Sequence, residues 1–216
     1  MHISDGVLPT TISLAAYAAT ALGIGLSLKI LRQEDLPKIA VVTSSFFVAS
    51  LIHLPLGPTS VHLLLPGIVG ALLGPAAFLS ITIGLFLQSI LFQFGGLTAL
   101  GANAMMMGLP ALFCGFLFRA IRGTTLLTNT VAGAVAGGLG TLLAATILAG
   151  FLYTSGENFF GVAKLALVAH IPVIIIEAAV SAFIISFIFR VKPEMLHSAP
   201  RQQHGITGHP SDHCHD

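Results

Sequence analysis

Charged side chains are scarce in this chain of 216 residues. Lys, Arg, Asp and Glu together make up 8% of the residues, whereas hydrophobic residues make up 55% and the mean hydropathy is +0.96. Soluble globular domains typically contain about 25% charged residues. A soluble domain is therefore excluded, and the composition is that of a polytopic membrane protein. The formal net charge of +1 gives no reason to expect a nucleic-acid partner.

Several signatures of catalysis are also missing. The sequence contains no HExxH, GxSxG or Walker A motif, so neither an intramembrane metalloprotease nor an ATPase is supported. Trp is absent, and the two cysteines, Cys114 and Cys214, argue against a disulfide framework. No Lys or Arg precedes the first hydrophobic segment, so we expect that segment to be retained rather than removed as a signal peptide.

The hydrophobic residues fall into seven segments. A helix needs about 20 residues to cross about 30 Å of hydrocarbon, and we predict an all-α integral membrane protein with seven transmembrane helices. The third segment is the shortest and carries Pro66 and Gly67 in its middle. The segments run approximately over residues 10–31, 39–54, 60–73, 76–94, 97–118, 128–153 and 162–189.

The positions of Lys and Arg predict the orientation. Seven crossings with the N-terminus outside leave only Lys164 on the outer side. Cytoplasmic loops carry an excess of basic residues, so we predict the N-terminus outside and the C-terminus inside. The residues on the cytoplasmic side are then Lys29, Arg32, Lys38, Arg119, Arg122, Arg190, Lys192 and Arg201.

The sixth segment carries small residues at four-residue spacing, namely Ala132, Ala136, Gly140 and Ala144. Such a stripe lets another helix approach closely. We favour packing within this protein over docking of a separate subunit. A shorter stripe on the first segment consists of Ala15, Ala19 and Gly23.

The chain divides into a membrane domain over residues 1–191, with an N-terminal loop at 1–9, and a polar tail over 192–216. The tail is interrupted by prolines and rich in His, so we expect it to be disordered and cytoplasmic. Its final residues offer ligands for weak metal binding, although an inert polar tail is an equal alternative. These ligands are His209, His213, Cys214 and His215.

The first two residues, Met1 and His2, form a candidate metal chelate. The α-amine of Met1, the amide nitrogen of His2 and an imidazole nitrogen of His2 can close adjoining five- and six-membered rings. Planar nitrogen coordination suits Ni²⁺ or Cu²⁺ and suits Co²⁺ less well. The alternative is an ordinary frayed terminus.

A fourth nitrogen could come from a histidine at the outer end of another helix. His62 is the preferred candidate because we expect it to open a helix directly after the turn at residues 57–60; His53, at the end of the second segment, is the other. Gln93, Thr98 and Asn103 are predicted to support the ligands or the N-terminal loop by hydrogen bonds. Ordinary hydrogen bonds between helices are the alternative for these three.

In the seventh segment, His170 and Glu177 are seven residues apart and share one helix face. Polar groups inside a membrane often mark ion paths or proton relays. They therefore raise an alternative function, that of an intramembrane enzyme or a proton-coupled secondary metal carrier. The other interpretation is a Glu that is hydrogen-bonded between helices.

Three stretches together resemble the CbiM/NikM family, the substrate-binding membrane components of energy-coupling factor transporters for cobalt or nickel. They are Met1-His2-Ile3-Ser4-Asp5-Gly6-Val7-Leu8-Pro9, Pro58-Thr59-Ser60-Val61-His62 and Leu91-Phe92-Gln93-Phe94-Gly95-Gly96-Leu97-Thr98-Ala99-Leu100-Gly101-Ala102-Asn103. The resemblance extends from Met1 to about Arg190. The chain departs from it at Pro66, where nickel-type relatives commonly have Asn.

The resemblance implies a core of six helices with one added N-terminal helix in the bacterial or archaeal cell membrane. It implies that Met1, His2 and His62 bind Co²⁺ or Ni²⁺ as the transported substrate, with no cofactor and no enzymatic activity in this chain. It also implies partners: a transmembrane coupling subunit, cytoplasmic ATPase subunits and in some cases a small accessory membrane protein.

Overall fold

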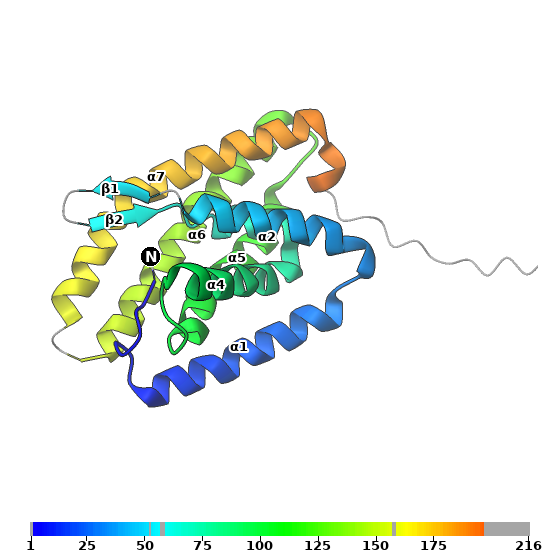
Figure 1. Ribbon diagram of the computed structural model, residues 1–216. Coiled ribbons are helices and arrows are strands. Elements are labelled where there is room, and N and C mark those ends of the chain that lie inside the picture. The colour runs from blue at the N-terminus through cyan, green and yellow to red at the C-terminus, as the bar shows by residue number, and fades with distance from the viewer. Residues whose placement is uncertain (1, 52, 57–58, 157–158, 197–216) are drawn as a thin grey trace, which may run out of the picture.

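The computed structural model describes residues 2–51, 53–56, 59–156 and 159–196, with the backbone alone for 53–56 and 59–62. The helices are α1 (Thr10–Ile30), α2 (Leu36–Ser50), α3 (Pro66–Leu73), α4 (Ala77–Phe92), α5 (Leu100–Ile121), α6 (Leu126–Thr154) and α7 (Phe160–Val191). Short 3-10 turns lie at η1 (Gln33–Asp35), η2 (Gly74–Ala76) and η4 (Pro193–Leu196). Strands β1 (His53–Leu56) and β2 (Thr59–His62) form an antiparallel hairpin. Figure 1 shows the helices gathered into one bundle.

The all-helical membrane class predicted from hydropathy is confirmed. Five helical stretches within the described residues are long and apolar enough to cross a membrane. They are Thr10–Ile30, Pro66–Phe92, Leu100–Ile121, Leu126–Thr154 and Phe160–Val191. The 15 residues of α2 rise only about 22 Å. Seven separate crossings therefore stay a prediction, whereas a multi-pass membrane protein is established.

The prediction of a third helix over residues 60–73 was wrong in its first half. Residues 59–62 belong to the hairpin, and α3 starts only at Pro66. Pro is favoured in the first turn of a helix because its missing N–H would have no partner there. The eight residues of α3 rise about 12 Å, which is less than half of the hydrocarbon thickness.

Small residues let the inner helices touch through their backbones, as predicted for the sixth segment. A Cβ added to Gly67 on α3 would lie 2.0 Å from the Ala136 carbonyl oxygen on α6, and one added to Gly70 would lie 1.9 Å from that of Ala111 on α5. The stripe on α6 is buried inside the protein. The stripe predicted on α1 is only partly correct, because Ala15 is exposed while Ala16 and Thr20 are buried.

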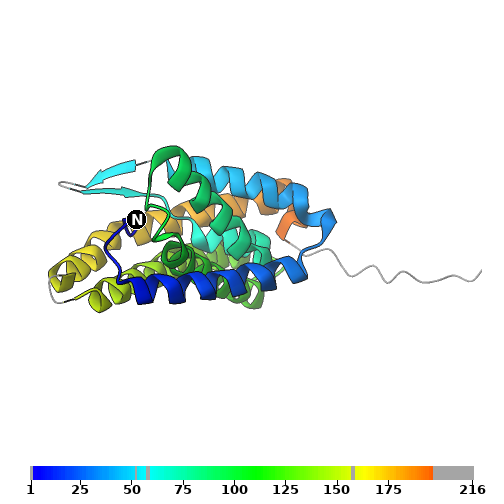
Figure 2. The same ribbon diagram turned by 60° about the horizontal axis from the view of Figure 1, so that its bottom comes forward.

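The bundle has two distinct ends. The hairpin, the start of the chain and the loop between α4 and α5 lie at one end, which we call the hairpin end (Figures 1 and 2). The turns η1, η2 and η4 lie at the opposite end. Close contacts of Gly70 with Ala111 and of Gly74 with Arg119 show that α3 runs in the same direction as α5.

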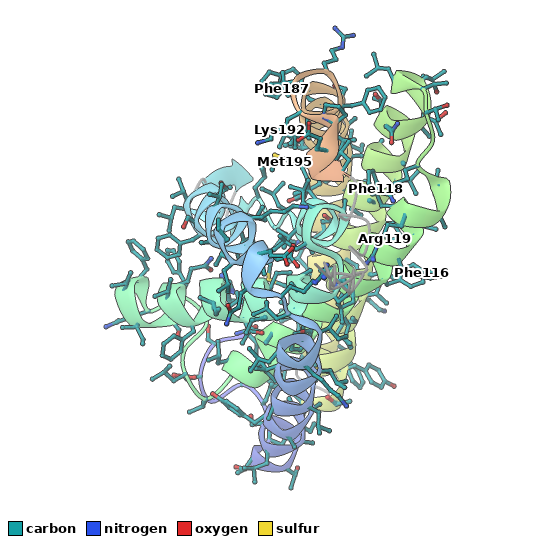
Figure 3. All side chains as sticks on the ribbon, turned by 90° about the vertical axis from the view of Figure 1, so that its right-hand side faces the viewer. Phe116, Phe118, Arg119, Phe187, Lys192 and Met195 are labelled. Carbon is teal, nitrogen blue, oxygen red and sulfur yellow. The ribbon has the colours of Figure 1, made fainter. Side chains whose placement is uncertain are left out.

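The opposite end holds the segment that follows α7. Lys38 donates a hydrogen bond from Nζ to the carbonyl of Met195 at 2.8 Å, and Arg122 donates one to the carbonyl of Leu196. The Leu196 side chain is buried. Residues 193–196 are thus packed against the bundle, and Figure 3 looks onto this end, with Arg119 and Met195 labelled.

Candidate functional site

The side chain of Asn103 binds the loop that precedes α1 to the start of α5. Asn103 accepts a hydrogen bond on Oδ1 from the Ile3 amide at 2.8 Å and donates one from Nδ2 to the Ile3 carbonyl at 3.0 Å. Both side chains are buried. A primary amide carries a donor and an acceptor side by side, so Asn103 pairs with Ile3 as a neighbouring strand would. His2 is thereby held through the residue that follows it.

The half-buried ring of His2 lies at the hairpin end beside the loop between α4 and α5. It stacks on the ring of Phe94, with centroids 6.3 Å apart and planes inclined by 15°. Gly95, with φ +81°, allows this approach, because a Cβ there would lie 3.0 Å from the Cβ of His2 and 2.8 Å from Nδ2 of Asn103. An imidazole nitrogen is a ligand that late first-row divalent metals commonly take.

Asp5 fastens the same loop at a second point. Its Oδ1 accepts hydrogen bonds from the Thr98 amide at 2.8 Å, the Thr98 hydroxyl at 2.5 Å and the Ala99 amide at 3.3 Å. These amides directly precede α5, and a carboxylate is stabilised near a helix N-terminus. The Thr98 hydroxyl and the neighbouring amides hold the pKa of Asp5 below its usual value despite the opposing effect of desolvation.

The hairpin brings together the backbones of His62, the predicted ligand, and His53, the less favoured candidate that was expected at most to support the site. Its register pairs the Cα atoms of His53 and His62, with Leu54 facing Val61. The predictions that His53 ends a helix and that His62 starts one were wrong, because both residues lie in strands. The side chains of His53 and His62 are outside the described residues.

The three predicted supporting residues have different surroundings. Asn103 and Thr98 contact the N-terminal loop, through Ile3 and Asp5 respectively. Gln93 is exposed and ends α4 in a left-handed conformation with φ +58°. The anchoring role of Asp5 was missed, although the adjacent pair Gly95 and Gly96 was a usable signal. A Cβ at Gly96 would lie 2.1 Å from Cγ of Asp5.

The polar pair on α7 is buried, and its two members have separate partners. Glu177 is 0% exposed and accepts hydrogen bonds from the amides of Leu64 and Leu65, the latter at 2.9 Å to Oε1 and 3.0 Å to Oε2. His170 is 5% exposed, and its Nδ1 lies 2.6 Å from the Ala166 carbonyl oxygen. No hydrogen bond joins His170 to Glu177 within the described part of the chain, so their role as a relay stays a prediction.

A cavity of about 350 Å³ lies at the opposite end of the bundle. Its charged lining residues are Arg32, Lys38, Arg119, Glu34, Asp35 and Glu194. Three cationic and three anionic groups balance one another, and Lys38 already binds the Met195 carbonyl. The charged groups that line this cavity therefore show no excess of either sign.

Among the described residues, no group of three or more His, Cys, Asp or Glu is arranged to hold a metal ion. The predicted ligand set lies largely beyond that search, since Met1 and the side chain of His62 are not described and the amide nitrogen of His2 belongs to the backbone. The tail ligands His209, His213, Cys214 and His215 also lie outside the described residues.

Comparison with known proteins gives a consistent result. The CbiM family model, described as a cobalt uptake substrate-specific transmembrane region, matches residues 2–195. A Haemophilus influenzae protein named as a metal transport protein is 38% identical over 202 residues, covering 91% of this chain and 97% of the relative. A protein of Archaeoglobus fulgidus named as a fused nickel transport protein, NikMN, is 31% identical over 204 residues, covering 91% of this chain and 68% of the relative.

A relative from Halobacterium salinarum, named as the cobalt transport protein CbiM, is 35% identical over 207 residues, covering 87% of this chain and 93% of the relative. A solved structure described as a truncated transition metal transporter aligns with a TM-score of 0.69 at 24% identity. The alignment covers 88% of this chain and 99% of that chain. At this level of identity the structural likeness shows a common fold.

Proposed function

Because the chain belongs to the CbiM family of cobalt uptake substrate-specific transmembrane proteins, we propose that it captures Co²⁺ or Ni²⁺ at the hairpin end. The ligands in this proposal are the Met1 amine, the amide and imidazole nitrogens of His2, and the imidazole of His62. The metal is the transported substrate, and the chain is the specificity subunit of an ATP-driven importer of the energy-coupling factor type.

Two hydrogen bonds between Asn103 and Ile3 carry this proposal most directly. A chelate built from the first two residues is useful only if those residues have a defined position, since a frayed terminus loses entropy on binding a metal. The Asn103 clamp on Ile3 and the anchoring of Asp5 both fix the loop within three residues of His2. The Asn103 clamp is buried and lies next to His2, and such a fixed position is what a terminal ligand requires.

The hairpin supports His62 as the source of the fourth nitrogen. It lies at the same end of the bundle as His2 (Figures 1 and 2), and its backbone continues into Leu64 and Leu65, which Glu177 holds. Four nitrogens in a plane favour Ni²⁺, whereas the family also transports cobalt. We therefore propose nickel first and cobalt second.

The distribution of basic residues supports an N-terminus outside and a C-terminus inside. Seven of them lie at the ends of the helices or in the turns at the opposite end of the bundle, and Lys164 lies near the hairpin end of α7. The seven are Lys29, Arg32, Lys38, Arg119, Arg122, Arg190 and Lys192. With this orientation the metal is captured outside, in the bacterial or archaeal cell membrane.

Energy for uptake would come from other subunits, since the sequence contains no Walker A motif. We propose a transmembrane coupling subunit, cytoplasmic ATPase subunits and a small accessory membrane protein as partners. The bundle exposes large apolar side chains along its helices, Phe116 and Phe183 among them, and these surfaces are available to lipid and to membrane partners.

Substitution of the paired histidines tests the ligand set. Titration of the purified protein with Ni²⁺ should show that His62→Ala weakens binding by more than the roughly 10-fold to 100-fold that loss of a supporting hydrogen bond costs. His53→Ala, at the facing position of the hairpin, is the matched control and should bind as the unsubstituted protein does. An affinity of His62→Ala equal to that of the unsubstituted protein would refute His62 as a ligand.

A further inference from the structure

The start of α3 is buried deep within the bundle. Gly67, its second residue, packs against Ala136, Gly137 and Gly140 near the middle of α6. The residues directly before it, Leu63–Leu65, are not helical. Non-helical backbone at membrane depth is tolerated only where the protein supplies hydrogen-bond partners for its N–H groups. Leu64 and Leu65 therefore require acceptors from another element.

Glu177 on α7 supplies those acceptors. Its carboxylate receives the amides of Leu64 and Leu65, which are 113 and 112 residues away in the sequence. Leu65 has a φ of +49°, a conformation that is uncommon for residues other than glycine. Such a conformation persists where its surroundings fix it, and here the buried carboxylate of Glu177 does so by binding the Leu64 and Leu65 amides.

His62 lies two residues before Leu64, so their Cα atoms are at most about 7 Å apart. From these contacts we infer that Glu177 is a positioning residue for the metal site. By binding the Leu64 and Leu65 amides it fixes the depth at which β2 ends, and with it the position of His62. This inference rests on the proposed function, in which His62 is a ligand.

The chemistry of the carboxylate explains why Glu suits this role. An ionised carboxylate only accepts hydrogen bonds, and its two oxygens can serve both amides together. The side-chain amide of Gln has one oxygen, and its NH₂ group would face a backbone N–H as a second donor. Oε1 of Glu177 accepts from both amides, and Oε2 lies 3.0 Å from the Leu65 nitrogen. Glu177→Gln therefore keeps the size of the side chain but places a donor against the Leu65 N–H and weakens the hold on that residue.

Glu177→Gln is the direct test, with Ser181→Ala as its matched control. Ser181 is also 0% exposed and lies one turn further along α7. In titrations with NiCl₂ we expect Glu177→Gln to weaken binding by about 10-fold to 100-fold, as loss of a supporting contact does, and Ser181→Ala to stay within about two-fold. At saturating Ni²⁺ the visible absorption of Glu177→Gln should be shifted, because the His62 ring reaches the metal from a changed position.

A double substitution separates positioning from a general effect on the fold. If Glu177 acts through His62, Glu177→Gln adds no further loss of affinity in the His62→Ala background. If Glu177→Gln does not yield folded protein, Glu177→Asp, which withdraws the carboxylate by one methylene, is measured with the same expectations. Two results would overturn the inference. One is that Glu177→Gln leaves the affinity and the absorption unchanged; the other is that Glu177→Gln lowers the affinity in the His62→Ala background by the same factor as in the unsubstituted protein.

The outcomes also distinguish this inference from the proposed function. If the unsubstituted protein binds Ni²⁺ through His62 and Glu177→Gln binds in the same way, only the positioning role is refuted. If the unsubstituted protein binds neither Ni²⁺ nor Co²⁺, the proposed function and this inference are refuted together.

Discussion

Asn103 shows how one residue can define a terminus. Its amide meets both the N–H and the carbonyl of Ile3 in a site closed to water. Removal of such a side chain leaves two backbone groups without their partner, and each buried unsatisfied group costs about 1–3 kcal/mol. Loss of the two Asn103 hydrogen bonds should therefore loosen the position of His2 more than loss of an exposed polar contact would.

We predict that Asn103→Ala weakens Ni²⁺ binding by about 10-fold or more, since 1.4 kcal/mol corresponds to a factor of ten. Isothermal titration of the purified protein measures this change. Asn129→Ala is the control, because Asn129 is equally buried but binds the carbonyls of Gly123 and Thr125 at the opposite end. If both variants lose the same affinity, the effect of Asn103 is on the fold rather than on the loop.

At the scale of residues, polar side chains within an otherwise apolar sequence indicated which positions contact the N-terminal loop. Gln93, Thr98 and Asn103 were expected to hold the ligands or the N-terminal loop, or to make ordinary hydrogen bonds between helices. Thr98 and Asn103 contact the loop, whereas Gln93 is exposed. The interaction of Glu177 with Leu64 and Leu65 could not be predicted, because its partners are backbone amides of residues whose side chains are apolar. Asp5 was missed for the same reason, since most of its contacts are to backbone N–H groups.

At the scale of elements, the loop before α1 is bound to the start of α5. Asp5 accepts the amides of Thr98 and Ala99, which directly precede α5, and the glycine pair at 95–96 clears the space for it. A helix and a loop from distant parts of the chain thereby stabilise each other. The ionisation state of Asp5 should therefore affect the stability of both the loop and α5.

This arrangement predicts a specific pH dependence. The pKa of Asp5 is lowered in the folded protein, so its stabilising effect is complete above the pKa of the unfolded chain, about 4. It is lost as the pH falls through the lower pKa of the folded state. The melting temperature of Asp5→Asn in detergent should lie below that of the unsubstituted protein from pH 5 to 8, and the gap should narrow below about pH 4.

Glu34→Gln is a suitable control, because Glu34 is an exposed carboxylate at the opposite end of the bundle. The difference in melting temperature between Glu34→Gln and the unsubstituted protein should not narrow in this way below about pH 4. A gap for Asp5→Asn that stays constant down to pH 3 would show that the ionised form of Asp5 is not what anchors the loop.

The helices themselves were largely predictable, and the third segment was the exception. Hydropathy reports whether a stretch is buried in apolar surroundings, but not whether its backbone is helical. Residues 59–62 pair with β1, and the amides of Leu64 and Leu65 bind Glu177 instead of helical carbonyls. The presence of Pro66 inside the segment was consistent with the late start of α3.

At the scale of the molecule, composition predicts a polytopic membrane protein. The order of the helices along the chain predicts that the basic residues gather at one end of the bundle. The juxtaposition of the chain start, the loop at 93–99 and the hairpin does not follow from local pattern, because it depends on how the helices pack. Small residues on α3, α5 and α6 make that packing close. The resemblance of the sequence to the CbiM/NikM family implied that Met1, His2 and His62 meet at one metal site.

The central claim is that the amine of Met1 is a ligand, and a removable N-terminal extension tests it most directly. The protein is titrated with Ni²⁺ while the extension is attached and again after proteolysis restores Met1 as the first residue, which intact mass confirms. We predict one Ni²⁺ per chain after cleavage, with the absorption of a planar nitrogen site, and at least about 100-fold weaker binding before it. Equal affinity and equal absorption before and after cleavage would contradict the claim.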